Sequence, residues 1–368
     1  MGKNALCVHL TYVPYLRAAG ELKTKPTQHS VKELQSVGIQ PDIIVLRTEH
    51  QLNLSIRKKV ALFCNVDEHS VVQSVDAPTI YEVPILMQEQ GLDETILNKM
   101  GLPVGDAPGL KPWRAFLERR HKAEQTEPVH IALVGKYDLQ DAYKSIREAL
   151  SQAGTYNDCK VVVDFVNSEK ITDDNIEKEL KGKAGVVIGP GFGQRGIEGK
   201  FVALRYTRTH NIPTFGICLG MQCMAIEFAR DVLGLQDANS REMDEKTPHN
   251  VIDIMEEQKS ITNMGGTMRL GAYECVVCKG SKAYEAYQKE HIQERHRHRY
   301  EFNSEYRDQY EAAGMKCTGV NPETGLVEII EMPTLRWFVG TQFHPEYSST
   351  VLNPHPLFLS FIKEAIKK

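Results

Sequence analysis

The segment Phe215–Gln222 reads FGICLGMQ and sets one cysteine between two glycines. The apolar run before it predicts a strand, and the residues after it predict a helix from about Leu219. Gly216 and Gly220 carry no side chains, so they permit the sharp turn that such a junction needs. We therefore predict a nucleophile elbow. It would expose the sulfur of Cys218 at a helix N-terminus, where backbone N–H groups and the helix dipole favour a thiolate.

Two further segments decide this interpretation, because a single cysteine is more often a small buried core residue than a nucleophile. Phe343–Glu346 reads FHPE and supplies the imidazole of His344 and a carboxylate for a Cys/His/acid arrangement. Pro345 suits the end of a strand, and the bend that it imposes determines how the imidazole and the carboxylate meet. Ile188–Gly193 is a glycine-rich loop that can direct backbone N–H groups at a developing oxyanion.

A glycine loop, an elbow cysteine and a His-Pro-Glu segment, in this order, resemble the class I glutamine amidotransferases. Four other stretches, spread over most of the chain, resemble the CTP synthase family: Gly20–Val31, Ala61–Val66, Gly265–Gly271 and Glu294–Glu301. The resemblance implies an α/β fold, in which a doubly wound class I glutamine amidotransferase domain follows a partial P-loop-type α/β synthase (amidoligase) domain. It also implies the synthesis of CTP from UTP, ATP and glutamine in the cytoplasm, with Mg-ATP, a GTP activator and a dimer or tetramer in the full-length enzyme.

The resemblance also implies roles for individual residues. It implies a catalytic triad of Cys218, His344 and Glu346. The backbone N–H of Leu219, directly after the nucleophile, is expected to bind the oxyanion. Relatives usually have two adjacent glycines where this chain has Pro190 and Gly191, and proline has no N–H. We therefore expect Gly191 to be the second oxyanion donor.

Substrate contacts follow from the resemblance as well. For glutamine, Gln222 and Glu242 are expected at the amino end and Arg297 at the carboxylate end. Without the resemblance, the His-Arg run 295–299 would be interpreted as a solvated basic face or a phosphate patch. For UTP, the implied contacts are Lys23, Lys25, Gln28 and Lys59. From the residues alone, the lysines among them would be ordinary surface lysines.

The composition indicates which kinds of binding partner the chain lacks features for. A net charge of -4 and 41% hydrophobic residues give no support for binding to nucleic acid or to a membrane. The eight cysteines show no disulfide framework, which favours a reducing cytoplasm. Cys275 and Cys278 have the spacing of half a zinc site, but no second pair follows, so we expect no metal. We also expect no cofactor bound by the amidotransferase domain.

The alternation of apolar runs and turn signals predicts three regions. These are the C-terminal part of a synthase domain over 1–87, a helical linker over 88–128 and the amidotransferase domain over 129–368. In the first region we expect strands at 6–13, 42–46 and 60–63 and a helix at 31–37. In the linker we expect helices at 92–100 and 113–124. In the third region we expect strands at 131–135, 161–166 and 184–188, and helices at 142–153 and 356–367.

The first region raises a difficulty, because the sequence contains no G-x-x-x-x-G-K-[ST] segment that would bind the phosphates of ATP. We therefore expect a truncated chain that shows at most glutaminase activity. Two alternatives remain open. A stand-alone γ-glutamyl thiol hydrolase would have no use for the loop 23–30. A non-catalytic partner that modulates full-length CTP synthase would not need an intact triad, although truncation favours it.

Overall fold

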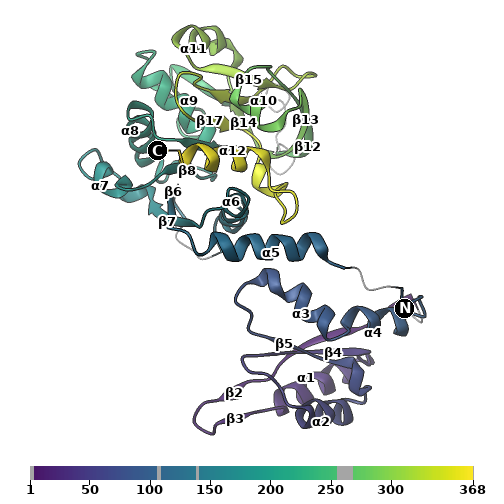
Figure 1. The fold of residues 1–368 in the computed structure, drawn as a ribbon. Coiled ribbons are helices and arrows are strands. Elements are labelled where there is room, and N and C mark those ends of the chain that lie inside the picture. The colour runs from purple at the N-terminus through teal and green to yellow at the C-terminus, as the bar shows by residue number, and fades with distance from the viewer. Residues whose placement is uncertain (1–3, 106–108, 138–140, 255–267, 368) are drawn as a thin grey trace. The chain divides into compact units, whose positions relative to one another are not determined.

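The computed structural model describes residues 4–105, 109–137, 141–254 and 268–367. It divides into two compact units, 1–117 and 118–368 (Figure 1). The division falls within helix α5 (Lys111–Ala123), one of the two helices expected in the linker. The three-part division at residues 87 and 128 stays a prediction.

The smaller unit is built on a parallel sheet in the order β1-β4-β5. Its strands are β1 (Val8–Tyr12), β4 (Ile43–Thr48) and β5 (Val71–Val75), and a short hairpin pairs β2 (Tyr15–Leu16) with β3 (Glu21–Leu22). Its helices are α1 (Lys25–Ser36), α2 (Leu54–Cys64), α3 (Val83–Glu89) and α4 (Leu92–Lys99). The buried core of this unit contains Val31, Ile44, Leu46, Val60 and Val71.

The expected strand at 60–63 is wrong, because these residues lie in α2. The Asn53 side chain caps the helix by accepting a hydrogen bond from the Ile56 N–H at 2.9 Å, and Asn65 ends it in the left-handed conformation. Val60 is buried whereas Phe63 is exposed, as expected when a helix turns successive apolar residues through different directions. The third strand of the sheet is β5, which we did not predict.

The larger unit is built on a nine-stranded sheet in the order β13-β12-β15-β16-β17-β9-β8-β6-β7. Five neighbouring strands run parallel: β7 (Val161–Asn167), β6 (Val129–Gly135), β8 (Gly185–Ile188), β9 (Thr214–Ile217) and β17 (Phe338–Thr341). Antiparallel pairing extends the sheet through β16 (Val327–Glu331), β15 (Lys316–Val320), β12 (Arg269–Val277) and β13 (His291–His298). A second sheet contains β10 (Ala238–Ser240), β11 (His249–Ile254) and β14 (Tyr300–Phe302).

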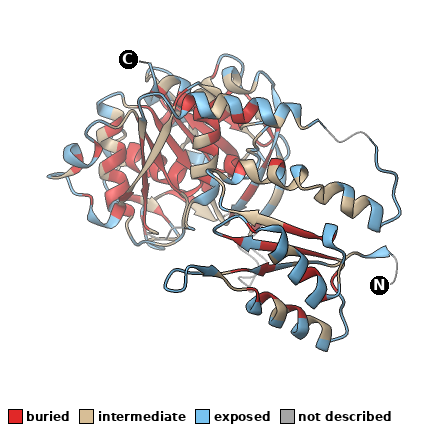
Figure 2. Ribbon diagram, turned by 60° about the horizontal axis from the view of Figure 1, so that its bottom comes forward, coloured by how far each residue is buried: buried red, intermediate tan, exposed pale blue. Residues whose placement is uncertain are grey.

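Two buried clusters, one on each face of the large sheet, confirm the expected doubly wound α/β fold. Helices α7 (Ile176–Leu180), α8 (Ile197–Thr209) and α9 (Leu219–Asp231) contribute to one cluster. Helices α6 (Lys144–Tyr156), α10 (Lys282–Tyr287) and α12 (Pro356–Ala365) contribute to the other. The short helix α11 (Arg307–Ala313) packs on β15. Figure 2 shows the buried residues concentrated in the sheet and on the helix faces that cover it.

This fold positions the predicted site residues. The segments 189–193, 218–222 and 342–346 directly follow the carboxyl ends of the parallel strands β8, β9 and β17. These ends meet at one edge of the sheet, where ligands of doubly wound folds usually bind. Among the described residues, no helix has both the length and the apolar character needed to cross a membrane.

Candidate active site

Cys218 lies at the predicted junction between a strand and a helix. It follows β9, occupies the N-cap position of α9 and has φ 53° and ψ −105°, a conformation that is costly for a residue with a side chain. Its neighbours need to be glycines. A Cβ on Gly216 would lie 2.4 Å from the Met224 sulfur, and a Cβ on Gly220 would lie 2.2 Å from the Ile188 carbonyl oxygen. The elbow therefore depends on close packing between α9 and the sheet.

His344 and Glu346 meet at the end of β17. Nδ1 of His344 lies 2.7 Å from Oε1 of Glu346, and both side chains are buried. Pro345 begins a short 3₁₀ turn that provides the bend expected from the sequence. The backbone N–H of His344 donates to the Arg295 carbonyl oxygen at 2.8 Å, and its ring stacks on Tyr347. The imidazole is therefore held by its backbone, by its carboxylate partner and by an aromatic neighbour.

The second imidazole nitrogen faces the cysteine. Nε2 of His344 is buried and has no hydrogen-bond partner within the described part of the chain. Burial alone would lower the pKa of His344, but the nearby sulfur of Cys218 and the carboxylate of Glu346 raise it to about 11. The site thus favours a protonated imidazole beside the sulfur of Cys218.

A small pocket opens beside the sulfur. Its lining residues are Gly191, Phe192, Cys218, Gln222, Glu242, His298, Arg299 and Tyr300. Its cavity volume is about 20 Å³, which is room for about one water molecule. The Glu242 carboxylate accepts a hydrogen bond from the Gly193 N–H at 2.8 Å, so the turn after β10 closes directly on the glycine loop.

The structure corrects the expected arginine contact. Arg297 lies on β13, where alternate side chains point outward, and it is exposed. β13 ends at His298 and the chain bends before β14, so Arg299 leaves this alternation and lines the pocket. Of the expected glutamine contacts, the structure therefore brings Gln222 and Glu242 to the cysteine but not Arg297.

Two lysines that the sequence analysis did not single out shape the glycine loop. Nζ of Lys200 is fully buried and donates to the Gly189 carbonyl oxygen at 2.6 Å, and burial lowers its pKa to about 8. Nζ of Lys136 donates to the Gly193 carbonyl oxygen at 2.9 Å. A Cβ on Gly191 would lie 3.4 Å from the Leu219 side chain, so the two expected oxyanion donors belong to neighbouring residues.

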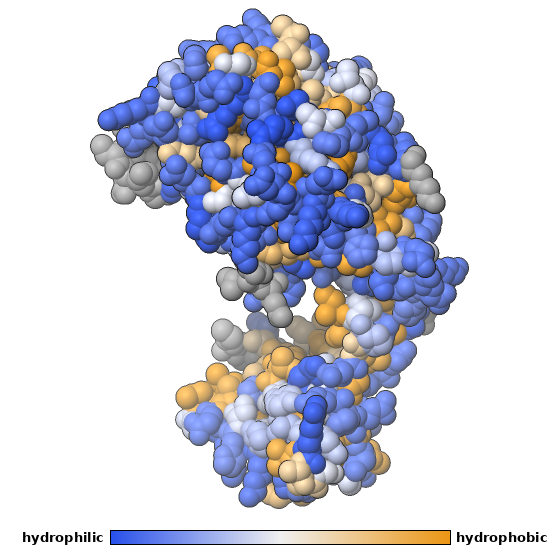
Figure 3. Space-filling model, turned by 90° about the vertical axis from the view of Figure 1, so that its left-hand side faces the viewer, coloured by the Kyte–Doolittle hydropathy of each residue, from blue (hydrophilic) through white to orange (hydrophobic). Residues whose placement is uncertain are grey.

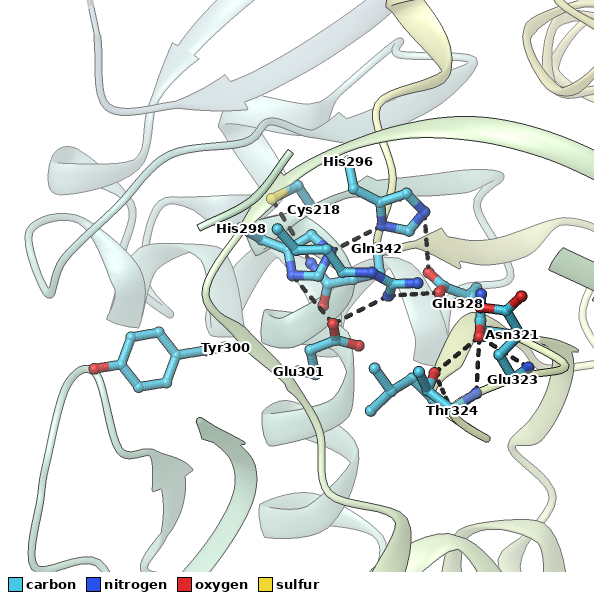
Figure 4. Close-up of polar contacts among 12 residues, drawn as sticks. Cys218, His296, His298, Tyr300, Glu301, Asn321, Glu323, Thr324, Glu328 and Gln342 are labelled. Carbon is cyan, nitrogen blue, oxygen red and sulfur yellow. Dashed lines mark hydrogen bonds and ion pairs between the residues drawn. The ribbon is translucent and has the colours of Figure 1, made fainter. Parts of the chain in front are cut away.

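Behind the pocket lies a buried ionic cluster, defined here as Arg269, His296, His298, Glu301 and Glu328 (Figure 4). Nη1 of Arg269 lies 2.8 Å from Glu328 Oε1 and 3.2 Å from Glu301 Oε1. Nδ1 of His296 lies 2.8 Å from Nε2 of His298. The cluster comes from two of the stretches that resembled CTP synthases and from β16, although Gly265–Thr267 of the first stretch lie outside the described residues.

Burial controls the ionisation of this cluster. It lowers the pKa of His296 to about 3, assisted by the charges of Arg269 and His344, and it lowers the pKa of His298 well below 6.5. Burial also raises the pKa values of Glu301 and Glu328, and Arg269 opposes that rise. Both imidazoles are therefore neutral, and the two carboxyl groups compete for the one guanidinium.

The expected nucleotide residues lie in the smaller unit. Lys23, Lys25 and Gln28 gather at the N-terminus of α1, an end of a helix that favours phosphate groups. The Lys23 side chain forms an ion pair with Glu21, and the Gln28 amide donates to the Thr24 hydroxyl at 3.2 Å. Lys59 is exposed on α2.

The positions of Cys275 and Cys278 bear on the question of a metal site. Cys275 is buried on β12, whereas Cys278 follows the strand and is exposed. Within the described ranges, no group of three or more His, Cys, Asp or Glu side chains could hold a metal ion. We therefore assign no described residue to the Mg-ATP that the resemblance implies.

Comparisons with known proteins agree with the fold. The family model of the CTP synthase N-terminus matches residues 1–102, and that of class-I glutamine amidotransferases matches residues 138–364. A CTP synthase of Bacteroides thetaiotaomicron is 80% identical over 367 residues, which are 100% of this chain and 68% of that protein. A CTP synthase of Porphyromonas gingivalis is 64% identical, again over 100% of this chain and 68% of that protein.

One solved structure resembles the larger unit. It is the glutaminase domain of Trypanosoma brucei CTPS with bound acivicin, which is 38% identical with a TM-score of 0.62. The alignment covers 65% of this chain and 94% of that domain. The fold and the matches thus define a class I glutamine amidotransferase domain that follows a CTP synthase N-terminal region. The chain belongs to the CTP synthase family.

These matches change two expectations. The truncation expected from the sequence is not supported, because the CTP synthase N-terminus model covers residues 1–102. The same match argues against a stand-alone γ-glutamyl hydrolase, which would not need such a region.

Proposed function

We propose that this chain hydrolyses glutamine at Cys218, and that the ammonia released serves the conversion of UTP to CTP. The observation that carries the proposal is the arrangement at the sheet edge. A cysteine at a strained elbow faces an imidazole whose other nitrogen is held 2.7 Å from a carboxylate. Membership of the CTP synthase family supports the use of the ammonia.

In the first half-reaction, the thiolate of Cys218 attacks the carboxamide carbon of glutamine. The oxyanion that forms is bound by the N–H groups of Leu219 and Gly191. The protonated imidazole of His344 gives its proton to the departing nitrogen, so ammonia leaves and a glutamyl thioester remains. Glu346 stabilises the charged imidazole and keeps Nε2 directed at the sulfur.

In the second half-reaction, the now neutral imidazole takes a proton from water as the water attacks the thioester carbonyl. The carbon–sulfur bond breaks, its electron pair stays on the sulfur, and glutamate leaves. The thiolate and the protonated imidazole are then restored. No step needs a cofactor in the amidotransferase domain.

Three residues in the pocket wall suit the ends of glutamine. The carboxylate of Glu242 and the amide oxygen of Gln222 can accept hydrogen bonds from the α-ammonium group, and the guanidinium of Arg299 can bind the α-carboxylate. Glu242 would exchange its contact with the Gly193 N–H for the substrate. Glutamine binding would therefore separate the glycine loop from the turn after β10.

For UTP, we propose the N-terminus of α1, with Lys23, Lys25 and Gln28 as contacts and Lys59 as a further one. The exposed ammonium groups and the helix N-terminus support this assignment, since both attract phosphate.

The experiment is ammonia release from glutamine by the purified chain, with and without GTP, compared with Cys218→Ala and Cys223→Ala. Cys223 is a matched control, because it lies on the same helix, is equally buried and does not line the pocket. We expect Cys218→Ala to abolish release and Cys223→Ala to retain it. Release that survives Cys218→Ala, or a folded chain without any release, would refute the proposal.

A further inference from the structure

Gln342 has no role in the mechanism above, yet it touches the reacting atom. It follows β17 directly, is completely buried, and its Nε2 lies 3.7 Å from Sγ of Cys218 (Figure 4). This distance is within reach of a hydrogen bond, because sulfur is a large acceptor. Gln342 and His344 lie two residues apart at the bend that directly follows β17, and both are buried beside Cys218.

The orientation of the Gln342 amide is fixed by its neighbours. Nε2 of Gln222 donates to the Gln342 side-chain oxygen at 3.2 Å and to the Tyr300 carbonyl oxygen at 2.8 Å. The Tyr300 carbonyl can only accept, so the Gln222 amide must present its NH₂ group in this direction. The Gln342 oxygen must then face Gln222, which leaves the Gln342 NH₂ group facing the sulfur.

The backbone holds Gln342 in place as well. Its N–H donates to the Glu328 carbonyl oxygen at 2.8 Å, and the Cys218 N–H donates to the neighbouring Thr341 carbonyl oxygen at 2.7 Å. The end of β17 therefore fixes the distance between the amide and the elbow. Neither group needs to move to make the contact.

We propose that Gln342 is a further active-site residue of the glutaminase reaction, and that its amide donates a hydrogen bond to the thiolate of Cys218. The inference rests on the proposed function for the role of Cys218 as nucleophile. It assigns Gln222 a second task, which is to orient the donor.

The contact acts at two points of the reaction. Before attack, the hydrogen bond from Gln342 stabilises the negative sulfur, as the protonated His344 also does. The pair of thiolate and imidazolium therefore persists to lower pH. When the thioester is hydrolysed, the carbon–sulfur bond breaks and its electron pair returns to the sulfur, where the same N–H receives it. In the thioester itself the sulfur is neutral, so the hydrogen bond is weakest there. The donor therefore favours departure of the thiolate.

The test compares the wild-type chain with Gln342→Met and Gln342→Glu. Met has a similar size and no donor. Glu keeps an oxygen for Gln222 and replaces only the sulfur-facing donor by an acceptor. The readouts are the pH profile of kcat/KM for glutamine, which reports groups of the free enzyme, and the rate of Cys218 alkylation by iodoacetamide, followed by the mass of its peptide. The exposed Cys278 is an internal reference for reagent reactivity.

In Gln342→Met, we expect the acid limb of both profiles to move to higher pH by about one unit, which is about tenfold slower alkylation on that limb. In Gln342→Glu we expect a larger shift in the same direction. The matched control is Asn321→Leu. Asn321 is also a buried amide at the end of a strand of this sheet, and it bonds the Glu274 carbonyl oxygen and the turn 321–324, not the sulfur. This control should lower stability and leave the acid limb unchanged.

The outcomes separate the two proposals. If wild-type glutaminase is active and neither Gln342 variant moves the acid limb, the inference is overturned and the proposed function stands. The inference is also overturned if Asn321→Leu moves the limb as far as Gln342→Met, because the effect would then be one of general stability. If the wild type releases no ammonia and Cys218 alkylates no faster than Cys278, the proposed function fails and the inference fails with it. Should Gln342→Met not fold, the isosteric Gln342→Glu decides alone.

Discussion

The two units of the molecule differ in how deeply they bury charged side chains and in how many apolar side chains they leave exposed. The larger unit buries Arg269 with two glutamates and two histidines. The smaller unit keeps its ion pairs at the surface, such as Lys58–Glu68, in which both side chains are about half exposed. Among the described residues, exposed large apolar side chains number thirteen in the smaller unit and six in the larger one, although the larger unit has about twice the residues. In the view of Figure 3 the larger unit is mainly blue with scattered orange patches, and orange apolar residues also lie at the surface of the smaller unit.

This difference shows that only a sheet covered on both faces can bury a cluster of charged side chains. The nine-stranded sheet has helices on both faces, and it can enclose a polar cluster whose charges compensate one another. The three-stranded sheet supports only a small core, and charges placed there would remain close to solvent. The buried cluster stands directly behind the pocket, since His298 belongs to both. Its burial costs stability in the unit that carries the proposed chemistry.

The largest effect that tests this comparison is expected from Arg269→Met. The substitution leaves two buried carboxyl groups without their cation, so we expect the larger unit to lose about 3–5 kcal/mol of unfolding free energy at neutral pH. The matched change in the smaller unit, Lys58→Met, removes one partner of an exposed pair and should cost at most about 1 kcal/mol. Denaturant unfolding of the full chain, followed by hydrogen exchange in each unit, measures both. Equal costs in the two units would break the comparison.

A smaller effect is expected from the glycines. In Gly220→Ala, the new methyl group would lie 2.2 Å from the Ile188 carbonyl oxygen, so the elbow must shift away from β8. We expect a loss of about 1–3 kcal/mol together with a loss of glutaminase activity. Gly105 in the smaller unit has no atom within 4 Å of such a group, and Gly105→Ala should change stability by less than about 0.5 kcal/mol. Thermal unfolding measures the change in stability, and ammonia release measures the activity. A Gly220→Ala variant with wild-type stability and activity would show that the close packing at the elbow is not needed.

The sequence was sufficient for features that depend on neighbours in the chain. The elbow at Cys218 and the bend at Pro345 follow from residue types within a few positions, and both are present. The expected exposure of the sulfur is wrong, because Cys218 is buried under the segments that close over the pocket. The doubly wound fold and the family followed from resemblance to known motifs. The role of the triad stays a proposal.

Features that depend on distant segments could not be predicted. Arg297 and Arg299 belong to one short run, and only the point at which β13 ends decides which of them reaches the pocket. The sequence contains no sign that Arg269 and Glu328, 59 residues apart, form an ion pair. The strand expected at 60–63 was wrong for a related reason. A four-residue apolar run fits a buried strand or one turn of a helix equally well. Here the caps at Asn53 and Asn65 decide for the helix.

The smallest effect that sharpens the comparison is the pH dependence of stability. Burial raises the pKa values of Glu301 and Glu328 in the folded state above the ordinary 4.5. Between pH 4.5 and these raised values, the folded chain therefore binds more protons than the unfolded chain. Their contribution to stability is complete below pH 4.5 and is lost as the pH rises through the raised pKa values. Burial lowers the pKa values of His296 and His298 below 6.5, so their contribution is complete above pH 6.5 and is lost only as the pH falls. Above pH 6.5 the two carboxyl groups are therefore the members of the cluster that still titrate. His344, whose pKa is raised to about 11, adds a loss in the same direction from outside the cluster.

We expect the larger unit to lose about 1 kcal/mol or more between pH 6.5 and pH 8.5. We expect this slope to be less steep in Glu301→Gln, because a glutamine is neutral at every pH, whereas Glu328 and His344 still titrate. The variant leaves the Arg269–Glu328 pair intact, so the cluster keeps one complete ion pair. Glu68→Gln in the exposed pair of the smaller unit is the control and should leave the slope unchanged. Calorimetric unfolding across this pH range measures the three slopes. A slope in Glu301→Gln as steep as in the wild type would mean that the proton lost above pH 6.5 comes from another group, and that the cluster holds its charges at little cost.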